Sequence, residues 1–142
     1  MNTTMIKEED VTSESISDLF KSAFFKVSEI DESNQFSVEF KTIDVIVYTD
    51  VQEKLIRFWF INKVDKKTHD EVVTRVNSAN TRSEFVKFYV VTEEDISYLV
   101  AEYKMSYEMG VIPFQVVNMA KSFENIVVNG GRLILGYDEE DE

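Results

Sequence analysis

The stretch that most constrains the fold of this chain is residues 55–62, which read LIRFWFIN. Successive side chains of a β-strand point to opposite faces of the sheet, so Ile56 and Phe58 would share one face while Trp59 and Ile61 share the other. A strand that is apolar on both faces cannot lie in a sheet that has one face in water. We therefore expect helices over one face and a second cover over the other, and a partner molecule could supply that second cover.

The size and composition of the chain favour one globular domain. It has 142 residues, of which 44% are hydrophobic and 13% aromatic, with four glycines and one proline. That is enough apolar material for a packed core and too little Gly and Pro for a long linker. We expect a polar lead over residues 1–12, a single domain over residues 13–128 and an acidic tail over residues 129–142.

Three segments have the apolar spacing of amphipathic helices. The first begins after Thr12 or Ser13, either of which can cap it. The second opens with Thr68 and Glu71 in the spacing of a capping box. The third begins at Pro113 and is expected to stop at residues 129–131, read NGG. Their apolar stripes are Ile16, Leu19, Phe20, Ala23, Phe24 and Val27; Val72, Val73, Val76 and Ala79; and Val116, Met119, Ala120, Phe123 and Val127.

The segments between these helices predict antiparallel strands. Residues 36–40 alternate apolar and polar, residues 44–49 are rich in Val and Ile, and short links join both to residues 55–62. Residues 85–91 and 96–107 predict a second hairpin around a charged turn. We expect an α+β fold in which an antiparallel sheet of about five strands has helices on one face, in the order α-β-β-β-α-β-β-α.

The charge of the chain excludes some classes of partner. With 15 Lys and Arg against 27 Asp and Glu, the net charge is −12, and such a surface repels nucleic-acid phosphates and anionic membranes. We expect no binding to nucleic acid or membrane. The first ten residues lack the apolar segment of a signal peptide, and no apolar run approaches the roughly 20 residues of a membrane span, so we expect a cytoplasmic protein.

The junction between the second helix and the following strand resembles a known family. It reads VNSAN at residues 76–80 and FVKFY at residues 85–89, followed by a charged turn, another strand and a glycine-led last helix. This pattern is similar to the YbjN family, whose members are proposed bacterial sensory-transduction regulators. The resemblance covers roughly residues 13–128, while Ile112 and Pro113 stand where the family usually has a polar helix cap.

The resemblance implies a type III secretion chaperone-like fold, similar to that of small, acidic, dimeric proteins that hold extended segments of partner proteins. It implies no catalytic residue. Asn77 and Asn80 are expected to be structural, joining the helix to the strand through hydrogen bonds between their side chains and the backbone.

No cluster in the sequence indicates a reaction, a cofactor or a metal ion. The chain has no cysteine and one histidine, His69, whose neighbours Asp70 and Glu71 would point in different directions from a helix start. Nucleophile elbows and phosphate-binding loops are absent from the sequence. We therefore expect a protein that is not an enzyme and has no catalytic residue, cofactor or metal site.

Aromatic residues are the remaining candidates for a site. Core packing explains most of them, but helices on one sheet face leave part of the set exposed or buried by association. A homodimer is the commonest way to bury such a surface. The candidate interface residues are Phe58, Trp59, Phe60, Tyr98 and Tyr103.

These observations predict a protein-binding regulator that forms a homodimer and binds other proteins. Two alternatives remain open: a dedicated secretion chaperone for one effector protein, and a small-ligand-binding or enzymatic domain whose site the sequence does not reveal. The acidic tail is interpreted as a solvated end, with a docking peptide as the alternative.

Overall fold

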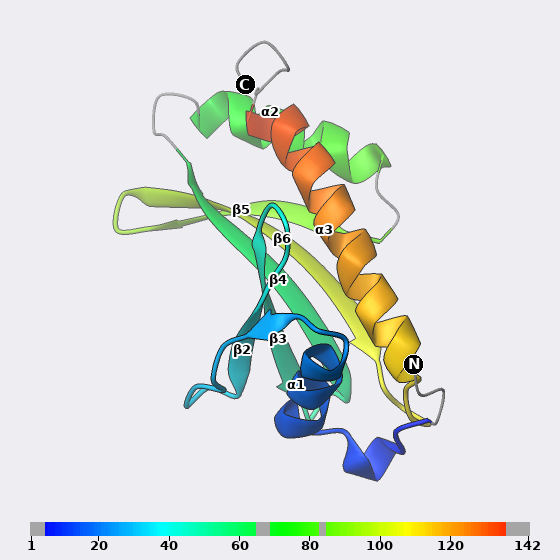
Figure 1. The fold of residues 1–142 in the computed structure, drawn as a ribbon. Coiled ribbons are helices and arrows are strands. Elements are labelled where there is room, and N and C mark those ends of the chain that lie inside the picture. Colours follow the sequence, from blue (N-terminus) through cyan, green and yellow to red (C-terminus); the bar gives the residue numbers. More distant parts are fainter. Residues whose placement is uncertain (1–4, 65–68, 83–84, 136–142) are drawn as a thin grey trace.

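The computed structural model describes residues 5–64, 69–82 and 85–135 (Figure 1). Along these residues the predicted order of helices and strands is confirmed, with two short additions at the beginning, η1 and β1. The elements are η1 (Glu8–Asp10), α1 (Ser13–Ser22), β1 (Lys26–Val27), β2 (Gln35–Glu39), β3 (Asp44–Asp50), β4 (Leu55–Val64), α2 (His69–Arg82), β5 (Lys87–Glu93), β6 (Ile96–Ser106) and α3 (Pro113–Leu135).

Within the described residues, the strands form one six-stranded antiparallel sheet in the order β1-β2-β3-β4-β6-β5. The longest ladder joins β4 to β6, from Leu55 opposite Ser106 to Val64 opposite Ser97. The β5–β6 hairpin turns at Glu94 and Asp95, both of which have positive φ, as a tight two-residue hairpin turn requires. Strand β4 thus lies in the interior of the sheet.

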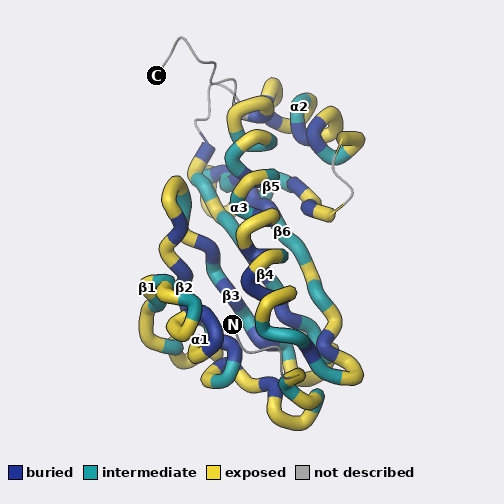
Figure 2. Tube along the Cα trace, turned by 45° about the vertical axis from the view of Figure 1, so that its right-hand side comes forward, coloured by how far each residue is buried: buried dark blue, intermediate teal, exposed yellow. Residues whose placement is uncertain are grey.

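The three helices lie along one face of the twisted sheet, as the sequence predicts (Figure 1). Helix α1 packs on β1–β3, α3 crosses β4, and α2 lies against β5. Between these layers Ile56 and Phe58 of β4 are fully buried, and the ring of Phe58 is 6.1 Å from that of Phe123 on α3. Figure 2 shows buried segments along β4 and β6 beneath exposed outer turns of α2 and α3.

Helix α1 begins where the sequence predicts but ends earlier. Thr12 caps it, because the Thr12 hydroxyl accepts a hydrogen bond from the Ser15 amide while the Ser15 side chain accepts one from the Thr12 amide. The helix ends at Ser22, and the assignment of Phe24 and Val27 to its stripe is wrong. Phe24 has a φ of 70°, which ends the helix, and Val27 lies in β1.

Helix α2 buries Val72, Val76 and Ala79, three members of the predicted stripe, whereas Val73 is exposed. The predicted cap residue Thr68 lies outside the described residues. Asn80 has the structural role expected of it: its side chain donates to the Phe88 carbonyl (2.8 Å) and accepts from the Phe88 amide (2.7 Å). The side chain therefore joins α2 to β5, as the sequence predicts for this residue.

Helix α3 begins at Pro113 as predicted, but the stop predicted at residues 129–131 is wrong, because the helix continues to Leu135. Glycine lowers helix propensity by only about 1 kcal/mol, and packing overcomes that cost here. A Cβ atom on Gly130 would lie 2.5 Å from Cζ of Phe88, so Gly130 lets α3 approach β5. Gly130 therefore marks close packing of α3 on β5, whereas a Cβ atom on Gly131 would meet no atom within 4 Å.

The segment before α1 is attached to the domain. Ile6 forms a β-bridge with Val111, and Glu8 forms an ion pair with Lys54 and accepts a hydrogen bond from the Met109 amide. The division of the chain at residues 12 and 128 stays a prediction, although described residues on the outer side of both points pack against the domain.

The two glycines of α3 provide a matched test of this packing. We expect Gly131→Ala to raise the free energy of unfolding by about 0.5–1 kcal/mol, because no atom blocks its Cβ and alanine is the better helix former. Gly130→Ala should lower it by about 1–3 kcal/mol, because the buried ring of Phe88 must move. Urea unfolding of both variants measures the difference, and equal effects would contradict this account.

Candidate protein-binding site

The face of the sheet opposite the helices has a shallow apolar groove at its centre. The register brings Trp59 and Ile61 of β4 beside Val100 of β6, with Tyr89 and Val91 of β5 on the same face. Ile61 is 49% exposed, although it lies in an interior strand of the sheet. The groove measures about 470 Å³ and is lined by Gln35, Ile46, Trp59, Ile61, Tyr89, Val91, Glu93, Tyr98 and Val100.

The carboxylate of Glu102 holds the aromatic residues of this face in place. Its Oε2 accepts hydrogen bonds from Nε1 of Trp59 (2.7 Å) and from the hydroxyl of Tyr89 (3.2 Å), and Nζ of Lys104 lies 3.4 Å from its Oε1. The three donors come from three adjacent strands, because Trp59 lies in β4, Tyr89 in β5 and Lys104 in β6. One acidic side chain therefore fixes the orientations of Trp59 and Tyr89.

This arrangement favours the charged form of Glu102. Burial alone would raise its pKa, but the hydrogen bond from Trp59, the charge of Lys104 and the hydrogen bond from Tyr89 outweigh burial and hold the pKa below the ordinary value of 4.5. Burial and the adjacent Glu102 charge raise the pKa of Tyr89, so its hydroxyl stays a donor. Glu102 is thus an anion whose carboxylate oxygens already accept hydrogen bonds from neighbouring side chains, as expected of a residue with a structural role.

On the side of β3, Trp59 is supported by Tyr48, and an ion pair between Arg57 and Asp50 lies next to Tyr48. The indole of Trp59 stacks on the ring of Tyr48, with 5.8 Å between the ring centroids and an angle of 9° between the ring planes. Next to Tyr48 in the register, Arg57 donates through Nε to Oδ2 of Asp50 at 3.2 Å. The backbone hydrogen bond from Glu53 and the hydrogen bond and charge of Arg57 lower the pKa of Asp50 against the effect of burial.

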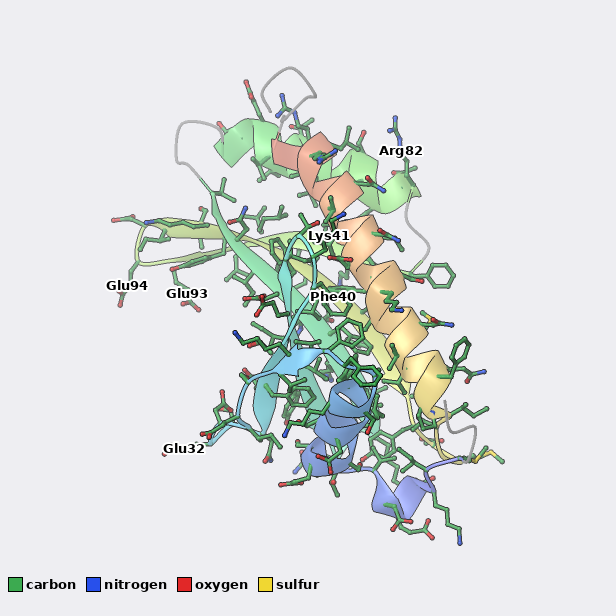
Figure 3. All side chains as sticks on the ribbon, in the orientation of Figure 1. Glu32, Phe40, Lys41, Arg82, Glu93 and Glu94 are labelled. Carbon is green, nitrogen blue, oxygen red and sulfur yellow. The ribbon has the colours of Figure 1, made fainter. Side chains whose placement is uncertain are left out.

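The charges of the sheet are confined to this open face. Every charged residue of the described strands lies on it, and the two signs are balanced, although the whole chain has a net charge of −12. Glu93 lies with Glu94 at the far end of the β5–β6 hairpin (Figure 3). The cationic residues are Lys26, Arg57, Lys63, Lys87 and Lys104, and the anionic ones are Glu39, Asp44, Asp50, Glu93 and Glu102.

The structure divides the five candidate interface residues between the two faces. Trp59 and Tyr98 lie together on the open face and line the groove. Phe58, Phe60 and Tyr103 lie on the helix face, where Phe58 is fully buried and stacks on Tyr103 with the ring centroids 6.0 Å apart. Phe58 belongs to the core of the chain itself, so its assignment to an interface is wrong.

Sequence reasoning missed several residues of the groove. Val91 and Val100, which line the groove, look like ordinary core residues in the sequence. Glu102, which bonds Trp59 and Tyr89 beside the groove, looks like a solvated charge. What brings them together is the pairing of β4, β5 and β6, and in particular the position of β6 between the other two strands. The alternation of β5 and β6 shows that Tyr89, Val91 and Val100 share a face, but it does not show what lies opposite them.

The described part of the chain offers little for metal chemistry. Within it, no three His, Cys, Asp or Glu residues come close enough together to hold a metal ion. The side chain of His69, the one histidine, lies outside the described residues. Among the described helices, none combines the length and apolar character that crossing a membrane requires.

Comparison with known proteins supports the fold. The chain matches no protein-family model and no curated protein sequence. Its structure is similar to the crystal structure of YbjN, a proposed transcription regulator from E. coli, with a TM-score of 0.72, 15% sequence identity, and coverage of 87% of this chain and 88% of that one. The chain has a YbjN-like fold. At this identity the similarity concerns the fold alone, and it agrees with the resemblance in the sequence.

The role of Glu102 can be tested through the pH dependence of stability. Because the folded-state pKa is lowered, the stabilisation is complete above the ordinary value of 4.5 and is lost as the pH falls through the folded-state value. We expect Glu102→Gln to lower the free energy of unfolding by about 1–2 kcal/mol at pH 7, with a smaller difference from wild type at pH 3.

Urea unfolding between pH 3 and pH 7 measures this difference. Glu93→Gln is the matched control, because this glutamate is exposed on the same face. Its effect should stay within about 0.5 kcal/mol. A loss in Glu102→Gln that is the same at every pH would contradict the electrostatic explanation.

Proposed function

We propose that this chain is a cytoplasmic protein-binding regulator without a catalytic step of its own, and that it forms a homodimer through the open face of its sheet. The observation that carries the proposal is the uncovered apolar groove around Trp59. The proposal explains why β4 places Trp59 and Ile61 on a face that no described helix covers.

The open face has the composition of a protein interface. Interface centres are enriched in Trp, Tyr and apolar side chains, and the residues that dominate binding are large side chains in well-packed positions. Trp59 is such a residue, because Glu102 and Tyr48 hold its ring before any partner arrives. A side chain that is already ordered loses little conformational entropy on binding.

Charge favours a second copy of the chain as the partner. Two molecules with a net charge of −12 repel each other, so a contact between them is least unfavourable where the charges balance. The described strands offer that balance on the open face. Two such faces can pack on each other about 10 Å apart around a two-fold axis, with each Trp59 close to the partner's groove.

The similarity to YbjN supports a regulatory role only by fold, since it says nothing of what this chain binds. Nucleic acid is a poor candidate for direct binding, because the cations of the open face are matched by an equal number of anions. Regulation through contacts between proteins fits the charge distribution better than contact with DNA.

A matched pair of exposed residues tests this interface. We expect the wild-type chain to have a solution mass of twice the chain mass of 16.5 kDa, and Ile61→Glu to weaken dimerisation at least about a hundredfold, because it places an unpaired charge in the interface. Val73→Glu, on the outer side of α2, is the control: Val73 is 42% exposed and Ile61 49%. Light scattering over a concentration series measures the mass.

The outcomes separate the explanations. Dissociation by Ile61→Glu but not by Val73→Glu supports the open face as the dimer interface. A wild-type chain that stays monomeric over the whole series would overturn the homodimer, and a dimer that Ile61→Glu leaves intact would place the interface elsewhere.

A further inference from the structure

A second apolar groove lies between the end of α1 and the beginning of α3, on the helix side of the molecule. It measures about 610 Å³, within the roughly 300–1,000 Å³ of small-molecule sites. Helix α1, the segment that follows it, the lead before η1 and the first turns of α3 all contribute to its wall. The lining residues are Met5, Ile6, Leu19, Ser22, Ala23, Phe24, Phe25, Pro113, Val117 and Lys121.

Charge is concentrated at one point of this groove. Among the described residues that line it, Lys121 is the one with a charge, and the others are apolar apart from Ser22. The Nζ atom of Lys121 lies 5.9 Å from the centroid of the Phe25 ring, within the range of a cation–π contact. The ring of Phe25 is fixed in turn by edge contact with Phe20, at 5.9 Å between centroids. The cation is therefore supported at the edge of an apolar cleft.

Phe24 at the rim of the groove ends helix α1, and the Phe25 amide donates to the Phe20 carbonyl across this helix end. The φ of Phe24, 70°, is rare for a bulky residue, and its side chain is 97% exposed. Met5, also in the lining, is 51% exposed. Exposed large apolar side chains gathered at one place are typical of binding sites. The side chains of Phe24 and Met5 therefore do not belong to the buried core of the domain.

We propose that this groove binds a small anionic amphiphile, an aliphatic chain that ends in a carboxylate. The aliphatic chain would lie against Leu19, Phe24 and Val117, and the carboxylate would pair with the ammonium group of Lys121. The proposal does not depend on the homodimer, because the groove and the open sheet face lie on opposite sides of the sheet.

The charges select this ligand over others. A cationic amphiphile would meet Lys121 with the same sign, and a neutral one would gain no ion pair with it. An anionic bilayer is a poor occupant, because the whole molecule has a net charge of −12 and is repelled by such a surface. A single anionic molecule meets only the local charge of Lys121.

Calorimetric titration of the full chain with sodium decanoate, below the concentration at which micelles form, tests the proposal. We expect saturable binding of one decanoate per chain, at least tenfold tighter than binding of decylammonium. Octanoate should bind more weakly by about fourfold for each methylene removed. Equal heats from decanoate and decylammonium would overturn the assignment of the charge.

Substitutions at Lys121 locate the site. We expect Lys121→Met to weaken decanoate binding by about tenfold or more and to remove the preference over decylammonium, while Lys121→Arg keeps that preference. Lys121 is exposed, so thermal unfolding should show both variants folded. Lys41→Met is the control, because Lys41 is exposed and is not among the residues that line the groove. Absent binding in the wild type, or wild-type affinity in Lys121→Met, would overturn the proposal.

Discussion

The fold depends on the pairing of β4 with β6, which fixes what each face of an interior strand meets. On one face Ile56 and Phe58 are fully buried, with Phe58 against Phe123 of α3, and that burial accounts for the position of the helix layer. On the other face Trp59 and Ile61 meet Glu102 and Val100 of β6. Because side chains alternate strictly along a strand, a shift of one residue would exchange the two sets and bury charge under the helices.

Glu102 shows how a charged residue can order the aromatic side chains beside it. Removing a carboxylate from water is unfavourable, and this one is offset by donors from Trp59, Tyr89 and Lys104. Those bonds also hold the two rings in a single arrangement, so the chain by itself defines this surface. In a purely apolar patch of the same size, no hydrogen bond would fix the orientation of the aromatic rings.

Most of the fold could be predicted from the sequence, because the helices and strands have clear periodicities. The apolar run around Phe58 shows that both faces of β4 bear apolar side chains, yet it does not show which face the helices cover. Phe24 continues the helical spacing of α1 but adopts a positive φ, and the spacing contains no sign of that. Gly130 looks like a helix stop, and only the closeness of Phe88 shows that it serves packing. The groove depends on pairing between distant strands, which periodicity does not encode.

The distribution of charge matters more for recognition than its total. A net charge of −12 by itself predicts a protein that repels anions and copies of itself. The structure provides two local exceptions, the balanced open face around Trp59 and the single cation of Lys121 beside an apolar groove. Elsewhere the acidic surface disfavours non-specific contacts, so these two places gain selectivity from their surroundings. The proposed homodimer and the proposed anionic ligand therefore both depend on the local charge and not on the net charge of the chain.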